Sequence, residues 1–540
     1  MQSGTAFANT ENVLCICNRQ EVFMIKGLLY ASCMTLLLSS SAMAAPGIFE
    51  KSIPELEAQM RNGSLTSEAI TRYYLQRIRV YDGCLNSMIT VNPAALQEAR
   101  QKDAERAAGK AVGPLHGIPI VLKDNYDTKD MKTTSGALAF KDLQPNRDAF
   151  TVKKLREAGA VIIGKANLTE LANHGMTISS MGGQTLNPYD LTRTPGGSSG
   201  GTGAAVAANF AAAGTGSDTV NSIRSPSSAN SLVGIRPTRG LVSRTGISPC
   251  SEFQDQGGPI ARSVTDAAIL LEVMAGYDPA DASTAVMKGK KVPDYTRALT
   301  GNAVKGKKIA LLTTNLGQDP EVRRVMEAAV RDFKALGADV VNVDIPELLV
   351  SSLIKNNDVQ RWEQSISLDN YLKELGSAAP VTNTKEYVAT GLLTPSVAKD
   401  MEVKAAEVNP ADNPEYKARL AKNARLHDFV VKYMADNKID AFLYPLQSIL
   451  VVQTNDSRGQ AERNGLMASV TGLPAITLPG GFSSATPTAP EGVPVGVELM
   501  GAPFSEELLI GMGYAYEQAT KHRRAPEAFP DLDFSSVPVD

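Results

Sequence analysis

Histidine and cysteine are scarce in this chain, whose 540 residues include four histidines and five cysteines. They form no CxxC or HExxH motif and no comparable ligand spacing, so the sequence predicts no metal site. A phosphate-binding cofactor is excluded as well. The stretch from Gly196 to Gly201 begins like a P-loop, but Thr202 stands where the lysine of that motif belongs. We therefore expect no cofactor.

The chain also lacks a large excess of charge and, beyond its beginning, long apolar runs. Its formal net charge is −3 at pH 7, and basic residues gather only in short clusters such as 305–308 and 522–524. This balance gives no reason to expect a nucleic acid or an anionic membrane as a partner. No stretch after the first 44 residues resembles a transmembrane span. The oligomeric state is open between monomer and homodimer.

The beginning of the chain has the pattern of a secretory signal. Lys26 precedes an apolar stretch at 28–38, and the A-x-A sequence Ala42–Ala44 follows. We expect residues 1–44 to be removed and the protein to be exported, either periplasmic or secreted. Met24 is an alternative start of the chain, and a plain apolar strand is the alternative interpretation of the segment.

Only two cysteines, Cys84 and Cys250, follow this segment. They could pair in an oxidising compartment, although one possible pair is no disulfide framework. Pairing and free thiols are both open at this point.

Strand-like and helix-like segments alternate through residue 240 and return after residue 440, which is typical of an α/β fold with a largely internal sheet. We expect helices at 56–80 (with Ser67 capping its second segment), 151–158, 204–214, 263–275, 320–336 and 505–520. We expect strands at 118–122, 161–164, 308–312, 339–343, 441–444, 475–478 and 493–500.

Two regions stand apart from this alternation. Residues 308–343 have a β-α-β pattern that we interpret as a peripheral lobe. Residues 350–436 are polar and helix-rich and contain the single tryptophan, Trp362. We predict that they form a cap or insertion over the core that helps to shape a substrate pocket.

Three segments contain candidate catalytic residues. Ser198 lies in GGSSGG (196–201), Ser222 lies in GSDTVNSIRSP (216–226), and Lys123 ends the apolar run of HGIPIVLKDN (116–125). Serine is a weak nucleophile unless a base activates it. Two hydroxyls and one buried amine can form such a relay without histidine. A working lysine base needs its pKa lowered by about three units, or about 4 kcal/mol, which burial can supply.

A different hydrolase is the first alternative. GGSSG fits the G-x-S-x-G nucleophile elbow of α/β-hydrolases, with Ser198 or Ser199 served by His427 or His522. The pattern is weakly specific, and the residues before it are turn-rich and do not form an apolar strand.

Taken together, the three segments resemble the amidase signature family. LHGIPIVLKD, VIIGKANLT, the GGSSGG and D-T-x-x-S-I-R pair, GIRPT, DQGGPIA and GLPAITLP follow one another in the family's order, over about residues 50–520. The resemblance implies an α/β fold with a large mixed central sheet flanked by helices on both faces. It also implies a single domain at 45–535 that contains the 350–436 insertion, followed by a short tail at 536–540.

The resemblance further assigns roles to residues. It makes Ser222 the nucleophile, Ser198 a bridging cis-serine and Lys123 the base. The backbone N–H groups of Thr219, Val220, Asn221 and Ser222 would form the oxyanion hole, with Asp218 and Arg224 as supports of this loop.

One departure from the family is Val220-Asn221, where two glycines are usual. If Val220 needs no positive φ the N–H donors are retained, whereas a positive φ would distort the hole. Ser217, where threonine is common, is a minor departure. Val220-Asn221 motivates an alternative of another class, a non-catalytic binding protein on an amidase scaffold.

The sequence thus predicts an amidase that uses water to hydrolyse a small-molecule or peptide amide through an acyl-enzyme. The segment GGQTLNP (182–188), together with export, resembles peptide amidases, which act on carboxy-terminal amides. Aryl acylamides and other small amides are alternatives. The transamidase subunit of tRNA-dependent amidotransferases shares the signature, and the signal segment argues against it.

Overall fold

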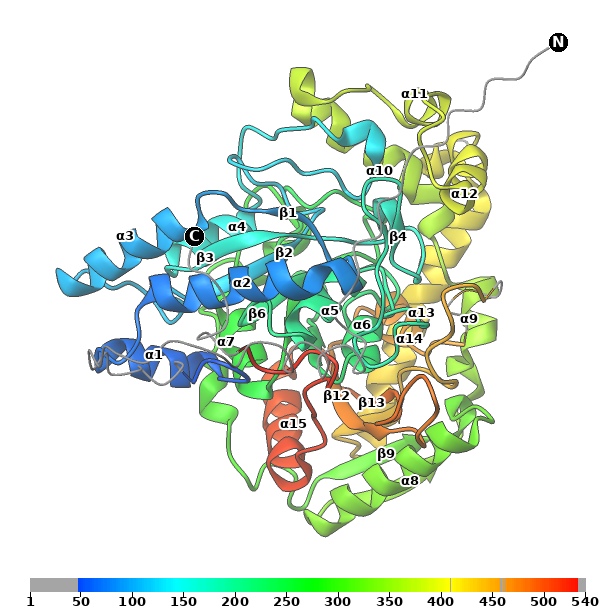
Figure 1. Ribbon diagram of the computed structural model, residues 1–540. Helices are drawn as coiled ribbons and strands as arrows, with labels where there is room; N and C mark the ends of the chain where they lie inside the picture. Colours follow the sequence, from blue (N-terminus) through cyan, green and yellow to red (C-terminus); the bar gives the residue numbers. More distant parts are fainter. Residues whose placement is uncertain (1–46, 408, 457–458, 460–461, 533–540) are drawn as a thin grey trace, which may run out of the picture. The chain divides into compact units, whose positions relative to one another are not determined.

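The computed structural model describes residues 47–407, 409–456, 459 and 462–532. The predicted signal segment at 1–44 and the tail at 536–540 lie outside the described residues. The described part is organised around one mixed sheet of 11 strands (Figure 1). In spatial order the strands are β1 (Met88–Val91), β3 (Val161–Ala166), β2 (Pro119–Lys123), β6 (Ala213–Asp218), β8 (Gln256–Ala261), β7 (Val233–Arg236), β12 (Ala475–Phe482), β13 (Pro494–Met500), β11 (Ala441–Pro445), β9 (Lys308–Leu312) and β10 (Asp339–Val343).

The sheet combines parallel and antiparallel pairs, as expected. Strand β2 runs parallel to both β3 and β6, and β9 runs parallel to β10 and β11, whereas the pairs around β8, β12 and β13 are antiparallel. Strands β2, β3, β6, β7 and β8 are buried along their whole length, which requires cover on both faces of the sheet. The predicted fold class is therefore confirmed.

Helices provide this cover. The helices of the described residues are α1 (Ile53–Arg61), α2 (Ser67–Leu85), α3 (Ala95–Ala107), α4 (Phe150–Glu157), α5 (Gly200–Ala207), α6 (Arg224–Ala229), α7 (Val264–Met274), α8 (Pro320–Ala335), α9 (Val350–Asn356), α10 (Gln360–Leu375), α11 (Thr384–Ala389), α12 (Pro395–Ala405), α13 (Pro414–Asp436), α14 (Leu466–Thr471) and α15 (Glu506–Thr520). Helices α5 and α6 contact each other and the strands near the middle of the sheet, and α15 contacts α7 and α8 (Figure 1).

Helix α6 lies very close to the sheet because the strands beneath it carry glycine. A Cβ added at Gly234 would come 2.2 Å from Ser227 Oγ, and one added at Gly496 would come 2.6 Å from Ser228 Cβ. Short serine side chains on the helix complete the fit. Ser222 lies in the loop that leads into α6, and this contact sets the position of that loop.

Three expectations are corrected by the structure. The helix expected at 204–214 ends at Ala207, because Asn209 adopts a positive φ of 59° and Ala213 already begins β6. The cap of α2 is Thr66, whose Oγ accepts a hydrogen bond from the Ala69 N–H. Residues 308–343 form no separate lobe, since β9 pairs with β11 and extends the main sheet.

The 350–436 region contains helices α9 to α13, as predicted from its polarity. Apolar residues of α10, α11 and α12 pack against the loops of the core in one cluster. The cluster joins Ala137, Phe140, Leu143 and Leu171 of the core to Leu368, Tyr371, Leu372, Leu375, Tyr387, Val397 and Met401 of the inserted helices.

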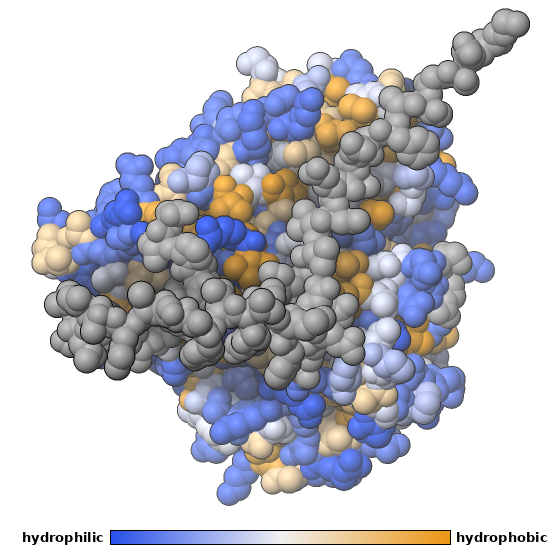
Figure 2. Space-filling model, in the orientation of Figure 1, coloured by the Kyte–Doolittle hydropathy of each residue, from blue (hydrophilic) through white to orange (hydrophobic). Residues whose placement is uncertain are grey.

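The face of the molecule in Figure 2 is largely hydrophilic, with hydrophobic residues scattered among the polar ones. Within the described ranges, every helix is too short or too polar to cross a bilayer. No group of three or more His, Cys, Asp or Glu side chains in that part of the chain is placed to hold a metal ion.

Candidate active site

Lys123 lies at the carboxyl end of β2 and is fully buried. Its Nζ donates hydrogen bonds to Ser198 Oγ at 2.8 Å and to Ser217 Oγ at 2.8 Å. The Ser217 carbonyl lies 3.3 Å from the same nitrogen. The strand therefore delivers the amine directly to the serine of the glycine-rich loop.

The pKa of Lys123 is strongly lowered. Burial lowers this pKa to about 7, although the charges of Asp255 and Asp218 act in the opposite direction. Transferring the ammonium form out of water is costly, whereas the neutral amine has hydroxyl partners here. The environment thus permits a neutral amine near pH 7, as a general base requires.

Ser198 and Ser222 lie on adjacent loops. The peptide bond between Gly197 and Ser198 is cis. The Ser199 N–H donates to the Ser222 carbonyl at 3.3 Å, which ties the two loops together. Ser222 is 7% exposed, whereas Ser198 is fully buried. Among the described residues no hydrogen bond joins the two hydroxyls. Of the two contacts that the predicted relay needs, the structure therefore contains the one between Lys123 and Ser198 but not the one between Ser198 and Ser222.

The loop from Thr219 to Ser222 offers four consecutive backbone N–H groups. None of them donates a hydrogen bond to another described residue. Neither Val220 nor Asn221 is among the described residues with positive φ, so the departure from the usual glycines leaves the backbone unstrained. Free N–H groups that converge on one point are what stabilises an oxyanion.

A fully buried ion-pair network holds this loop from behind. Arg224 pairs with Asp218 at 3.1 Å and with Glu498 at 2.7 Å, and Arg236 pairs with Asp218 at 2.8 Å. A further guanidinium nitrogen of Arg224 donates to the Val220 carbonyl at 2.7 Å. Burial alone would raise the pKa of Asp218, but the two arginines hold this pKa well below its usual range.

Thr219 is held from a second side. Its hydroxyl donates to Asp255 at 2.6 Å, and its carbonyl accepts a short hydrogen bond from Ser469 Oγ. Gln254 Nε2 lies 3.5 Å from the same carbonyl, while Gln254 Oε1 accepts from the Val359 N–H at 2.9 Å, next to the start of α10. The loop 219–222 and the start of α10 therefore share one side chain.

A cavity of about 620 Å³ opens in front of Ser222. The loop 219–222 forms one wall, residues 172–176 form another, and Gln360 and Ser396 reach it from α10 and α12. Met176 and Ile178 also line this cavity, which is the candidate substrate site.

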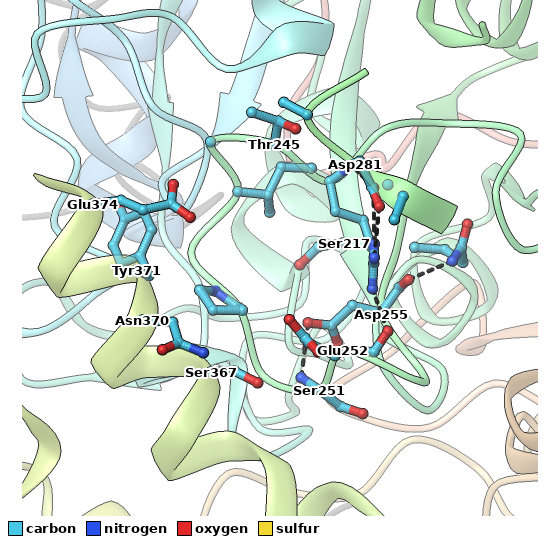
Figure 3. Close-up of a pocket in the computed structure, with 18 of the residues that line it drawn as sticks. Ser217, Thr245, Ser251, Glu252, Asp255, Asp281, Ser367, Asn370, Tyr371 and Glu374 are labelled. Carbon is cyan, nitrogen blue, oxygen red and sulfur yellow. Dashed lines mark hydrogen bonds and ion pairs between the residues drawn. The ribbon is translucent and has the colours of Figure 1, made fainter. Parts of the chain in front are cut away.

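A second cavity of about 580 Å³ is lined by Ser217 (Figure 3). Ser367, Asn370, Tyr371 and Glu374 of α10 line one side of it, and the segment around Asp255 lines the other. Its arginines are paired, Arg244 with Asp281 at 2.7 Å and Arg147 with Glu374 at 2.7 Å. Ser222 does not line it, so we do not place the substrate there.

The structure brings neither histidine of the α/β-hydrolase alternative to a serine. His427 Nδ1 lies 2.7 Å from the Thr471 carbonyl, and His522 Nε2 lies 3.4 Å from Asp332. The question left open for Cys250 is answered as well, since this residue is a free buried thiol and is not paired with Cys84. The Cys250 Sγ accepts a hydrogen bond from Gln360 Nε2 at 2.9 Å.

Two residues at the site have roles that the sequence did not indicate. Ser217 is only a minor departure from the family's usual threonine, yet its hydroxyl binds the Lys123 amine. Arg463 lies in a polar stretch without a motif, and it lines the cavity beside Asn221. The motif position of Ser217, next to Asp218, is a signal that could have identified the first, whereas no pattern marks the second.

Comparison with known proteins adds an independent finding. A family model described as Amidase matches residues 69–510. One of the subunits of the glutamyl-tRNA(Gln) amidotransferase from Moorella thermoacetica is 35% identical over 499 residues, which cover 88% of this chain and 97% of that protein.

Solved structures agree with this match. The native peptide amidase from Stenotrophomonas maltophilia superposes with a TM-score of 0.81 at 36% identity, over 89% of this chain and 99% of that one. An amidase family protein from Bacillus anthracis str. Ames gives a TM-score of 0.78 at 32% identity, over 89% and 93% of the two chains.

Proposed function

The chain belongs to the amidase family and is an enzyme acting on amide C–N bonds, and from this premise we propose a serine mechanism with Lys123 as its base. Neutral Lys123 accepts the proton of Ser198 while Ser198 accepts that of Ser222. Ser222 Oγ attacks the carbonyl carbon, and the backbone N–H groups of 219–222 hold the resulting oxyanion.

Collapse of this intermediate breaks the C–N bond. Ser198 returns a proton to the departing nitrogen, which leaves as ammonia or an amine, and Lys123 reprotonates Ser198. The acyl group is then bound to Ser222 as an ester. Water attacks the ester by the same relay, so the products are a carboxylic acid and free Ser222.

The contact between a fully buried Lys123 amine and Ser198 Oγ at 2.8 Å carries this proposal. The hydroxyl-to-hydroxyl contact must then form when substrate binds, and catalytic hydrogen bonds often tighten in this way.

Replacing Ser222 by alanine is the first test. We expect Ser222→Ala to lose hydrolysis of every amide substrate by at least about 100-fold in kcat, with binding retained. Labelling of the wild type, but not of Ser222→Ala, by a fluorophosphonate would support the assignment. Near-wild-type turnover of the variant would overturn it and would favour a binding protein or a different nucleophile.

For the substrate we propose the carboxy-terminal amide of a peptide, handled by an exported enzyme. The likeness to a peptide amidase over 89% of the chain supports this class, as does the cavity in front of Ser222, which is large enough for an amino-acid residue. A panel of peptide amides, anilides and other small amides, with Ser222→Ala as the control, tests it. Faster turnover of anilides would favour an aryl acylamidase.

The 35% identity to one component of an amidotransferase supports a second candidate, the transamidase part of such a complex. Co-purification of the tagged chain with partner subunits from its own cells would favour it. Hydrolysis of peptide amides by the purified chain alone would favour the first candidate.

A further inference from the structure

Arg463 stands out among the residues that line the cavity in front of Ser222. Its Nη1 donates a hydrogen bond to Asn221 Oδ1 at 2.9 Å, next to the proposed nucleophile. A Cβ added at Gly175, on the facing wall, would come 2.0 Å from the same nitrogen. The glycine therefore leaves the room that the guanidinium occupies inside the cavity.

The charge of Arg463 has no counter-ion in the part of the chain that the structure describes. No carboxylate there lies within ion-pair distance of it, and the one carboxylate that raises its pKa is Asp218, which is already paired with Arg224 and Arg236. Burial dominates and lowers the pKa of Arg463 to about 10, so the side chain is still cationic at neutral pH.

The other ionisable groups in the described lining of the cavity form no ion pair with Arg463. Asp456 lines the cavity but forms no ion pair with the Arg463 guanidinium, and burial lowers the pKa of His174, which is therefore neutral near pH 7. Lys404 near His174 is balanced by an ion pair with Asp400. The Arg463 guanidinium thus lies in the cavity beside the proposed nucleophile, without an ion pair to any described carboxylate.

A partly buried cation without an ion pair is less well solvated than one in water, and an anionic group of a ligand offsets that loss. The planar guanidinium has further donors beyond the nitrogen that Asn221 uses, and their fork matches the two oxygens of a carboxylate. We propose that Arg463 binds a carboxylate of the substrate, so that the preferred amides carry an anionic group close to the bond that is cleaved. This inference rests on the proposed function.

Matched substrate pairs test the proposal. N-acetyl-glutamic acid α-amide and N-acetyl-norleucine amide differ in a carboxylate on the acyl side. 4-Acetamidobenzoate and acetanilide differ in a carboxylate on the leaving-group side. We expect kcat/KM of the wild type to favour the anionic member of at least one pair by about 10-fold to 100-fold, the usual strength of charge-assisted hydrogen bonds.

Variants of Arg463 test whether this side chain causes the preference for anionic substrates. Arg463→Gln can still hydrogen-bond to Asn221. In this variant we expect the ratio of kcat/KM for the anionic substrate to kcat/KM for the neutral one to fall to about one, mainly because KM of the anionic substrate rises. Arg463→Lys should retain part of the preference. Arg331→Gln, which changes an exposed arginine on α8, is the matched control and should keep the full preference.

The outcomes separate the two proposals. Equal hydrolysis of anionic and neutral amides by the wild type, or a preference that survives Arg463→Gln, would overturn the role of Arg463 and leave the serine mechanism intact. Hydrolysis that persists in Ser222→Ala would instead overturn the mechanism. Weaker binding of the anionic amide to Ser222→Ala/Arg463→Gln than to Ser222→Ala, measured by calorimetry, would support the inference without any turnover.

Discussion

At the scale of single residues, the proposed chemistry depends on how the surroundings of Lys123 favour its neutral form. The amine has hydroxyl partners on two serines and no carboxylate in direct contact among the described residues, so burial prevails over the distant charges of Asp255 and Asp218. A lysine at the end of a buried strand can serve as a base for this reason.

The pH dependence of activity tests this point. Burial lowers the pKa of Lys123 to about 7, and the amine loses its proton as the pH rises through that value. We therefore expect kcat/KM to rise from about pH 5 to about pH 7 and to level off above about pH 8. A profile measured with a neutral substrate that is flat from about pH 5 to about pH 9 would contradict a lysine base with this pKa.

Arg224 is a second residue with a definite expected effect. Its loss would remove the ion pair of Glu498 and leave Asp218 with Arg236 alone in a fully buried site. Breaking such a network usually costs about 3–5 kcal/mol. We expect Arg224→Met to lower the free energy of unfolding by about this amount in urea.

A matched variant makes this measurement specific. Arg331→Met removes an exposed arginine and should change stability by less than about 0.5 kcal/mol. Similar stabilities of the two variants would show that the buried network does not hold the loop.

At the scale of elements, the short helix α6 joins the catalytic loop to the sheet. It begins two residues after Ser222 and packs on strands whose glycines leave no space for a side chain. The backbone of the oxyanion loop is thus positioned by the distance between a helix and a sheet.

Gly496→Ala tests this contact. The added methyl would come 2.6 Å from Ser228, so α6 must move away from β13. We expect a loss of about 1–3 kcal/mol in stability together with a lower kcat. The control is Gly301→Ala, since a methyl there meets no atom within 4 Å and should leave both quantities near wild type. Wild-type kcat in Gly496→Ala would contradict the role of this contact.

Elements with strong local signals were the ones that the sequence could predict. Strands β9 and β10 have the predicted bounds, and α8 begins at Pro320 behind the capping side chain of Asp319. The error at 204–214 has a local cause, because a run of small residues carries no periodicity that distinguishes a helix from a buried strand.

At the scale of the whole molecule, sequence order says little about which strands are neighbours. The β-α-β pattern of 308–343 suggests a separate lobe, yet β9 pairs with β11, whose Ala441 lies opposite Ile309. Contacts of this range depend on tertiary packing, and the same holds for Arg463, which a distant loop brings beside Asn221. The three catalytic candidates were identified from specific family motifs and their roles stay predictions, whereas the family itself is confirmed.

The export proposal belongs to this scale too. If residues 1–44 are a secretory signal, the protein isolated from the periplasm or the medium should begin at about Ala45. Mass spectrometry of the intact mature protein and sequencing of its first residues check this, with cells whose export is blocked as the control. Recovery of the full-length chain only from the cell interior would contradict the proposal.

The side chain of Gln254 connects the loop that contains Thr219 with the helix-rich region 350–436. One end of its side chain approaches the carbonyl of Thr219, and the other accepts a hydrogen bond from the N–H of Val359, just before α10. Under the proposed mechanism, in which the N–H groups of 219–222 hold the oxyanion, remodelling the helices of this region for a new substrate range would also disturb the stabilisation of the transition state. Selectivity and rate would then be coupled through one side chain, and a redesign of either would have to monitor the other.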